Sequence, residues 1–376
     1  IVIFFESIKS SEAKLFIERY AATSQKISAA IRFLASEPAA AISNSDLPSP
    51  TDLVLLTNNR GGMARLCVDL SRVNSKYDCV LGANLHATVP VDRHVFVKRI
   101  RVWVNADGFL SALDFKNLSS FQKDSGATWD FIANAGDGRT VEIRLHAEMI
   151  EDENTVVFQF SRPTEKLAVG KQLPAEADVR LTVRVDIEDR NFHSETKRND
   201  GADFHFSSNS RPLAKKIGFE FTPAGDRQLR VFADDGAYHS QPEWSDNIPH
   251  PVEQTRGQTG SGDAFSPGWF EIPLAKGANV ALTLTTETET KFKKQKSKSE
   301  GAPEGFATTL ESAAKQFVVR RDDFKTVIAG YPWFLDWGRD SLICARGLLA
   351  AGLKDEVKQI LLTFAKFEKN GTLPNT

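Results

Sequence analysis

The sequence contains few cysteines, only Cys67, Cys79 and Cys344 among 376 residues. They include no CxxC pair, and an odd, sparse set of this kind builds neither a disulfide framework nor a cysteine zinc site. Free, partly buried thiols are typical of proteins that stay in a reducing compartment. We therefore expect a cytoplasmic protein without structural disulfides.

An excess of charge of one sign is also absent, because 47 Lys and Arg residues face 49 Asp and Glu residues. Phosphate binding favours a strong basic excess, so nucleic acid is not an expected partner. No apolar run approaches the ~18 residues of a membrane-spanning helix, and the apolar opening Ile1–Phe5 lacks the basic region of a signal peptide. A membrane is therefore not an expected partner either.

The seven histidines are scattered, and none shows the close spacing of a metal motif. No nucleophile elbow GxSxG is present, and the glycine-rich stretch Gly257–Gly262 lacks the Lys-Ser/Thr that follows a phosphate-binding loop. We expect no metal and no organic cofactor.

The amount of apolar residues, 41% of the chain, is ordinary for a globular protein. In residues 1–50, apolar residues recur near the 3.6-residue period, and the stretch Ser36–Pro50 is rich in Ala, Ser and Pro. This pattern predicts a helical N-terminal segment over residues 11–35, followed by a connector. The stripe consists of Leu15, Phe16, Tyr20, Ile27, Ile31 and Leu34.

Residues 51–290 follow a period of two instead. Apolar and polar residues alternate in four stretches, and turn residues punctuate them at Asn105–Gly108, Asn134–Gly138 and Pro223–Gly225. One apolar and one polar face per strand is typical of antiparallel sheets. The fold class predicted here is a large antiparallel β-sandwich. The four stretches are Arg99–Val104, Val141–Met149, Val179–Glu188 and Val280–Leu284.

Residues 291–302 are basic and polar and are predicted to be a linker. From residue 303 to 376 the helical period returns. We expect a first helix around Phe306–Phe317 with Thr308 and Glu311 as a capping box, a second from Asp340 to Gly352, and a third from Lys354.

One stretch, Ala329–Asp340, combines residue types that bind sugars. Aromatic faces stack on the C–H faces of a pyranose, carboxylates accept hydrogen bonds from its hydroxyls, and arginine offers those hydroxyls a rigid donor fork. A second interpretation is that the aromatics are core and that an Asp–Arg pair is structural at a helix start. The chemistry alone leaves both interpretations open. The six candidates are Tyr331, Trp333, Asp336, Trp337, Arg339 and Asp340.

The run Thr326–Asp340 (TVIAGYPWFLDWGRD), with the later Leu373-Pro374-Asn375, resembles the glycogen debranching family. These are amylo-α-1,6-glucosidases with an (α/α)₆-barrel catalytic domain. Segments upstream are similar to the N-terminal β domain of that family, so the resemblance spans roughly residues 51–376. Those segments are Leu56–Gly62, Ser75–Asp78, Pro90–Arg93, Tyr238–His239, Pro242–Trp244, His250–Glu253, Arg256–Gly257 and Phe265–Gly268.

The resemblance implies roles for the candidate residues. Trp-Gly-Arg-Asp is similar to the Trp-x-Arg-Asp of glucoamylase-like barrels, in which Arg and Asp hold the terminal glucose of the −1 subsite. Arg339 and Asp340 would then grip the branch glucose, while Trp337 forms a wall. Asp336 would orient Arg339 or touch the sugar, and Tyr331 and Trp333 would line the rim. The neighbouring Phe334, Leu335, Leu342 and Ile343 are interpreted as core.

The resemblance also implies inverting hydrolysis of a branched α-glucan, glycogen or limit dextrin, by a carboxylic acid and a carboxylate base. In the family both groups lie after the Leu-Pro-Asn motif, so no residue up to Thr376 is assigned to either role. The roughly 70 residues from Pro303 to Thr376 hold three helices of average length, not the twelve of a barrel. We expect an incomplete (α/α)₆ barrel and a chain that is inactive by itself. Asp336 and Asp340 are poor candidates for the acid and base, because the adjacent Arg339 favours their ionised forms.

Two alternatives remain open. The β domain could be a non-catalytic glucan-binding module, or the chain could be another (α/α)₆-barrel glycosidase, such as a glucoamylase or trehalase relative. The module would bind through exposed tryptophans, although core packing is the commoner role of each one. The tryptophans in question are Trp103, Trp129, Trp244 and Trp269.

Overall fold

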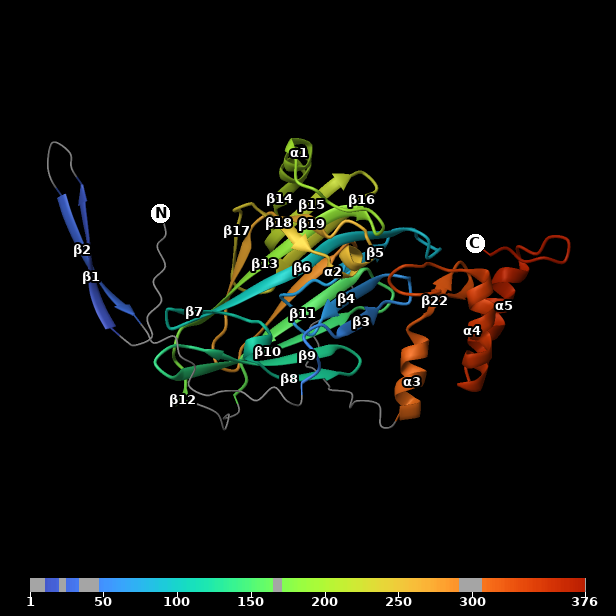
Figure 1. The fold of residues 1–376 in the computed structure, drawn as a ribbon, viewed down its shortest axis with the longest axis horizontal. Helices are drawn as coiled ribbons and strands as arrows, with labels where there is room; N and C mark the ends of the chain where they lie inside the picture. Colours follow the sequence, from blue (N-terminus) through green and yellow to red (C-terminus); the bar gives the residue numbers. More distant parts are fainter. Residues whose placement is uncertain (1–10, 20–24, 34–46, 165–170, 291–305, 376) are drawn as a thin grey trace.

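The computed structural model describes residues 11–19, 25–33, 47–164, 171–290 and 306–375 (Figure 1). Two large sheets pack against each other, and a small helical unit follows at the C-terminal end. The fold prediction of a large antiparallel β-sandwich followed by a few helices is confirmed. In the described part of the chain, no helix is long and apolar enough to cross a membrane.

The first sheet follows the order β17-β20-β13-β6-β5-β4-β3, with β7 on β6 and the pair β18–β19 beside β13. Its long central strands, β6 and β13, run antiparallel from Val179↔Ala106 to Asn191↔His94. The strands are β3 (Leu53–Thr57), β4 (Met63–Cys67), β5 (Cys79–Asn84), β6 (Arg93–Ala106), β7 (Phe109–Ala112), β13 (Val179–Asn191), β17 (Ala237–His239), β18 (Glu243–Pro249), β19 (Ser261–Ser266) and β20 (Trp269–Pro273).

The second sheet follows the order β14-β15-β16-β21-β11-β10-β9-β8, and the short β12 pairs with β10 in parallel. The 3₁₀ turn η1 (Phe115–Asn117) leads into this sheet. The strands are β8 (Leu118–Lys123), β9 (Ala127–Asn134), β10 (Arg139–Met149), β11 (Thr155–Ser161), β12 (Lys171–Gln172), β14 (Ser210–Pro212), β15 (Ile217–Ala224), β16 (Arg227–Ala233) and β21 (Asn279–Thr285).

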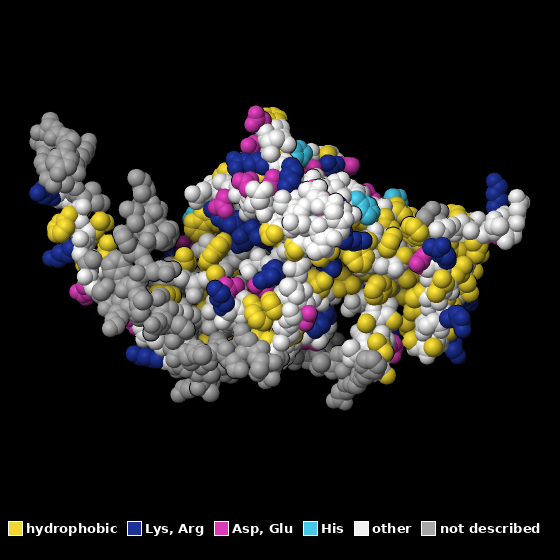
Figure 2. All heavy atoms as spheres, in the orientation of Figure 1, with side chains coloured by type: hydrophobic (Ala, Val, Ile, Leu, Met, Phe, Trp, Pro, Cys, Tyr) yellow, Lys and Arg dark blue, Asp and Glu magenta, His cyan; other side chains and the backbone are white. Residues whose placement is uncertain are grey.

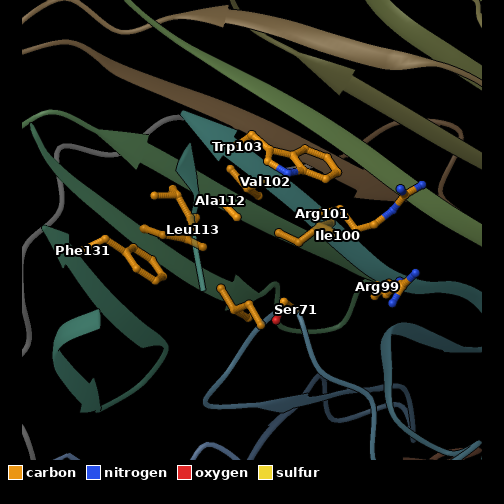
Figure 3. A pocket seen from close by; sticks show the side chains of 11 residues that line it. Ser71, Arg99, Ile100, Arg101, Val102, Trp103, Ala112, Leu113 and Phe131 are labelled. Atoms are coloured by element: carbon orange, nitrogen blue, oxygen red, sulfur yellow. The ribbon is translucent and has the colours of Figure 1, made fainter. Parts of the chain in front are cut away.

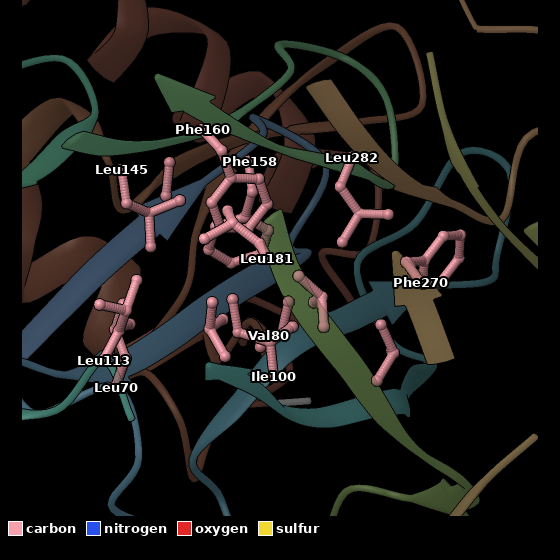
Figure 4. Packing of buried hydrophobic residues seen from close by; sticks show 14 of the residues in the cluster. Leu70, Val80, Ile100, Leu113, Leu145, Phe158, Phe160, Leu181, Phe270 and Leu282 are labelled. Carbon is pink, nitrogen blue, oxygen red and sulfur yellow. The ribbon is translucent and has the colours of Figure 1, made fainter. Parts of the chain in front are cut away.

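The core lies between the two sheets, where the inward-facing side chains of both sheets meet (Figure 4). Leu181 of β13 and Ile100 of β6 share this cluster with Leu145, Phe158 and Leu282 of the opposite sheet. The four predicted strand stretches lie within β6, β10, β13 and β21, and the three predicted turns separate strands. β6, β10 and β13 alternate buried and more exposed residues over part of their length, which explains the period of two, whereas β21 is buried on both faces.

The predicted N-terminal helix is wrong. Residues 11–35 contain two strands, β1 (Ser11–Arg19) and β2 (Gln25–Phe33), paired from Ser11↔Phe33 to Arg19↔Gln25. The segment also alternates as Leu15, Ile17 and then Ile27, Ala29, Ile31, and isoleucine favours strands. A short apolar segment supports both periods, and here the strand period prevails. Most of the predicted connector lies outside the described residues.

The C-terminal unit contains α3 (Phe306–Lys315), a hairpin of β22 (Val318–Arg321) and β23 (Phe324–Val327), and then α4 (Gly338–Ala350) and α5 (Lys354–Ala365). The three predicted helices are present. The capping box is wrong, because Thr308 lies inside α3 rather than before it. The predicted linker over residues 291–302 lies outside the described residues.

Two helices of the sandwich were not predicted, α1 (Asp200–Asn209) and α2 (Pro251–Thr255). The first begins where the Asn199 side chain accepts a hydrogen bond from the amide N–H of Ala202. The second is a single short turn that opens with a proline. It lies at the same end of the first sheet as β3, β4 and β5, beside the helical unit (Figure 1).

Candidate functional site

The candidate stretch 329–340 follows β23 and lies between the sandwich and α4. Its backbone closes on itself, since the Ala329 N–H donates to the Leu335 carbonyl at 2.7 Å and the Phe334 N–H donates to the Gly330 carbonyl at 2.8 Å. The sandwich holds it from the other side through Arg93, whose Nη1 donates to the Pro332 carbonyl at 2.9 Å. The stretch is therefore a compact loop fixed to both units.

Tyr331 is placed against the sandwich rather than at an open rim. Its ring lies 4.8 Å from the Arg93 guanidinium and 5.5 Å from the Phe317 ring. Its hydroxyl is buried and has no hydrogen-bond partner within the described residues. Burial raises the pKa of Tyr331 to about 12, against an opposing effect of Arg93. We assign Tyr331 a packing role.

Asp336 does not orient Arg339, which corrects that expectation. The carboxylate is 6% exposed and forms an ion pair with Arg321 at the end of β22. Burial raises the pKa of Asp336, and the adjacent Arg321 offsets part of this effect. Arg321 in turn lies over the rings of Phe364 and Phe367, at 5.6 and 5.1 Å. The pair therefore fixes the loop to the helices.

Arg321 was missed at the sequence level. It lies 15 residues before Asp336 and outside the aromatic stretch, and only the β22–β23 hairpin returns it to that carboxylate. The periodicity after residue 303 predicted helices only, so the strands β22 and β23 were not predicted. A lone arginine before a turn carries no signal that would have identified it.

Arg339 and Asp340 occupy the first turn of α4, behind Trp337 as the N-cap. The Arg339 side chain is 67% exposed and that of Asp340 39%, and the Nε and Oδ2 atoms are 4.0 Å apart. A structural ion pair at a helix start would be shorter and less exposed. The guanidinium is thus accessible to a ligand, which favours the sugar-binding interpretation.

The Leu-Pro-Asn motif proves to brace this helix end. The Asn375 carbonyl accepts from the Gly338 N–H at 2.8 Å, and its side-chain oxygen accepts from the Arg339 N–H at 3.3 Å. The Trp337 side chain makes no capping hydrogen bond. Two of the amide groups that a helix leaves unsatisfied at its N-terminus are therefore satisfied by a residue 36 positions later.

The two tryptophans of the loop remain at least partly accessible. Trp333 is 39% exposed, and the half-buried Trp337 packs edge-on against Phe334 at 5.4 Å. Phe334 and Ile343 were expected in the core, but they are 45% and 67% exposed. Trp337, Arg339 and Asp340 thus place an indole, a cation and a carboxylate at the start of α4, which suits the hydroxyls and C–H faces of a sugar.

The tryptophans of the sandwich do not form a comparable surface. Trp129 is fully buried and donates to the Val68 carbonyl at 2.8 Å, so it belongs to the core. Trp103 adjoins a cavity of about 120 Å³ on β6, together with Arg99 and Arg101 (Figure 3). Ligand pockets usually exceed about 300 Å³, so this one does not fit a glucan.

Trp269 and Trp244 are half-buried and committed to neighbours. The Trp269 ring stacks on His239 at 4.0 Å, and its Nε1 donates to Gln241 at 3.1 Å. The Trp244 Nε1 donates to Asp203 of α1. These contacts give each indole a structural role.

Two family models match this chain. A model described as glycogen debranching enzyme N terminal matches residues 54–281, well over half of the chain. A second, described as amylo-alpha-1,6-glucosidase, matches residues 312–376. A search of curated protein sequences gives no match.

Similar solved structures include a bacterial glucoamylase complexed with acarbose, at 12% identity and a TM-score of 0.45. That similarity covers 97% of this chain and 55% of the glucoamylase. A mutant of the heparan sulfate lyase HepC from Pedobacter heparinus is similar at 10% identity and a TM-score of 0.28, over 50% of this chain and 24% of that one. The chain thus spans about half the length of the glucoamylase.

Proposed function

This chain belongs to the glycogen debranching enzyme family, a family of glycoside hydrolases, and from that premise we propose that it carries part of the −1 subsite of an α-1,6-glucosidase acting on glycogen or limit dextrin. The observation that supports this most directly is the first turn of α4. There the exposed Arg339 and the half-buried Asp340 are adjacent, and Asn375 accepts hydrogen bonds from the backbone N–H groups of Gly338 and Arg339.

In this proposal, Arg339 donates to outer hydroxyls of the branch glucose and Asp340 accepts from a neighbouring hydroxyl. Charge-assisted hydrogen bonds of this kind are about twice as strong as neutral ones. Trp337 provides the wall against the sugar ring. Glycoside hydrolysis by this route uses carboxyl groups and water alone, so the proposal involves no cofactor.

Asp336 takes no catalytic role in this proposal. An inverting hydrolase places its acid and base across the sugar, about 6.5–9.5 Å apart with room for water. The Asp336 carboxylate is buried and bound by Arg321. We infer that the acid and the base are supplied from outside this chain, which is then inactive by itself.

The surfaces of α4 and α5 support a larger helical barrel. Their outer faces carry exposed apolar residues, and hydrophobic side chains gather over both helices at the right of Figure 2. Further barrel helices would cover such faces, because apolar area gains free energy when it leaves water. The exposed residues are Ile343, Leu349, Leu361 and Leu362.

We also propose a cytoplasmic location. Cys67 and Cys79 are buried free thiols, and burial raises their pKa values to about 12 and 11. Thiols of this kind are unreactive and are typical of reducing compartments.

The test measures isomaltose binding to the 376-residue chain by calorimetry. Arg339→Ala and Asp340→Asn should each weaken binding at least about tenfold, because each removes a charge-assisted hydrogen bond of roughly 1.5–3 kcal/mol. Arg346→Ala, an exposed arginine on the same helix, is the matched control and should bind as the wild type does.

Hydrolysis provides the second readout. The chain as it stands should release no glucose from limit dextrin, whereas a version extended beyond Thr376 should release it. If the 376-residue chain hydrolyses limit dextrin and Asp340→Asn abolishes that activity, the assignment of the acid and base to residues outside it is wrong.

A further inference from the structure

Trp333 lies against residues of the sandwich that no comparison assigns to a site. The Tyr77 ring is 6.5 Å from the Trp333 ring at 83°, and the Arg256 guanidinium lies 6.0 Å from that ring. Tyr77 belongs to the loop between β4 and β5, and Arg256 ends α2. Segments about 180 residues apart thus meet one exposed indole of the candidate loop.

A third group extends this surface. The Tyr77 hydroxyl and the Nδ1 atom of His193 are hydrogen-bonded at 3.0 Å, and the rings of His193 and Phe192 are 3.9 Å apart. His193 is exposed, and its Nδ1 atom is already hydrogen-bonded to the Tyr77 hydroxyl. The Nε2 atom is therefore the ring nitrogen left for a hydroxyl of a ligand.

Buried charges hold the loop that carries Tyr77. The fully buried Glu253 of α2 accepts from the Ser75 hydroxyl at 2.7 Å and from the Lys76 N–H at 2.9 Å. The buried Lys98 ammonium donates to the carbonyl oxygens of the same two residues, at 3.1 and 2.9 Å. The Glu253 carboxylate thereby fixes α2, and hence Arg256, to the loop that carries Tyr77.

The loop that carries His193 is held in a similar way. Arg190 is 5% exposed and pairs with the buried Glu188 at 2.9 Å. Its guanidinium also donates to the carbonyl oxygens of Phe192 at 3.1 Å and Ser194 at 2.9 Å. Burying charges is costly, and here they fix the positions of two loop tips. A surface held in this manner loses little conformational freedom when a ligand binds.

We propose that Trp333, Tyr77, His193 and Arg256 form a second sugar subsite, which binds the α-glucan chain that carries the branch glucose. A pyranose of that chain stacks on the exposed part of the Trp333 indole, and the Arg256 guanidinium and the His193 Nε2 bond its hydroxyls. This inference rests on the proposed function, because it takes the −1 subsite at Arg339 and Asp340 as its neighbour. It gives the sandwich a direct part in substrate selection.

The test compares two ligands on the 376-residue chain by calorimetry: glucose, and maltotriose that carries an α-1,6-linked glucose. Arg256→Ala and Trp333→Ala should each weaken binding of the branched tetrasaccharide about tenfold, since each removes a major contact. Glucose binding should stay unchanged, because glucose occupies the −1 subsite alone. The matched controls lie outside this surface. Trp269→Ala removes a half-buried tryptophan and is compared with Trp333→Ala, and Arg211→Ala removes an exposed arginine and is compared with Arg256→Ala.

Tyr77→Phe serves as the conservative variant. It keeps the ring against Trp333 but frees His193 Nδ1, so it should weaken tetrasaccharide binding less than Arg256→Ala does. Far-ultraviolet circular dichroism confirms that each variant is folded.

If both Arg256→Ala and Trp333→Ala bind the tetrasaccharide with wild-type affinity, the second subsite is wrong. If Arg339→Ala still weakens sugar binding in that case, the −1 proposal stands. An equal loss of glucose and tetrasaccharide binding in Arg256→Ala and Trp333→Ala would also overturn the second subsite, since the residues would then act on the −1 site. If the wild-type chain binds neither sugar, both proposals fail together.

Discussion

His250 is a buried side chain whose environment opposes charge. It is 1% exposed, and neither ring nitrogen has a hydrogen-bond partner within the described residues. Burial, with the nearby Lys98 and Arg190, lowers its pKa to about 3. A Cβ on Gly262 would come within 2.8 Å of its ring, so the absence of a side chain at Gly262 makes the room that the imidazole occupies.

This environment predicts acid sensitivity. A histidine of an unfolded chain has a pKa near 6.5, so between about pH 6.5 and 3 the unfolded state binds the proton and the folded state does not. Acidification therefore lowers the free energy of unfolding through that range, by at most about 1.4 kcal/mol per pH unit. Urea denaturation at pH 7, 6, 5 and 4 measures the slope, and His250→Phe should reduce it.

The matched control is His239→Ala, which removes an exposed histidine on β17. It should keep the wild-type slope between pH 7 and 4. If His250→Phe keeps that slope as well, the acid sensitivity arises from other groups.

At the scale of elements, α4 depends on a partner far along the chain. Asn375 satisfies the N–H groups of Gly338 and Arg339, and a Cβ on Gly338 would lie 2.3 Å from the Pro374 carbonyl. The residue before Arg339 is therefore a glycine so that the Pro374–Asn375 backbone can approach. The helix end and the candidate sugar contacts are held by the same contact.

Asn375→Ala should loosen this helix end. It removes the side-chain acceptor, and losing an N-terminal cap typically costs about 1 kcal/mol. Hydrogen exchange of the Arg339 and Asp340 amides should become faster, while the amides of α5 keep their protection. Lys369→Ala, at an exposed residue nearby, should change neither, and slower or unchanged exchange at Arg339 in Asn375→Ala would contradict the capping role.

At the scale of the whole molecule, Arg93 connects the sandwich to the C-terminal unit. Its side chain is fully buried, and it donates to the carbonyl oxygens of Gly61, Pro332 and Phe334 at 3.2, 2.9 and 3.4 Å. The guanidinium also lies 4.8 Å from the Tyr331 ring. Burial lowers the pKa of Arg93. Its planar fork makes this contact, and backbone hydrogen bonds from Arg320 to Asn59 and from Asp322 to Thr88 also join the two units.

Arg93→Met should therefore destabilise the chain by about 3 kcal/mol, because buried carbonyl groups lose their charged donor. Arg93→Lys should recover only part of the loss, since an ammonium lacks the planar fork. Urea denaturation measures the stability, and the intrinsic tryptophan fluorescence should shift to the red as the loop separates from the sandwich. Arg211→Met, at an arginine that is 71% exposed, is the control and should be neutral.

Much of the fold could be predicted from the sequence. Period-two alternation in residues 51–290 predicted the sheets, and period 3.6 after residue 303 predicted α3, α4 and α5, because burial of one face imprints its period on the chain. The N-terminal segment failed for the same reason, since residues 11–33 fit both periods. The assignment of Arg339 and Asp340 as sugar contacts stays a prediction.

Only the tertiary structure decided the partners. Arg321, rather than Arg339, binds Asp336, Asn375 satisfies the N-terminus of α4, and Arg93 fixes the loop before α4. Each contact joins residues that lie 15 to 239 positions apart. Local patterns record which face of an element is buried, whereas the partner of a polar side chain depends on where other elements return in space. The sequence by itself determined the alternating strands of the sandwich and the three C-terminal helices, and the folded chain decided which residues surround the candidate loop.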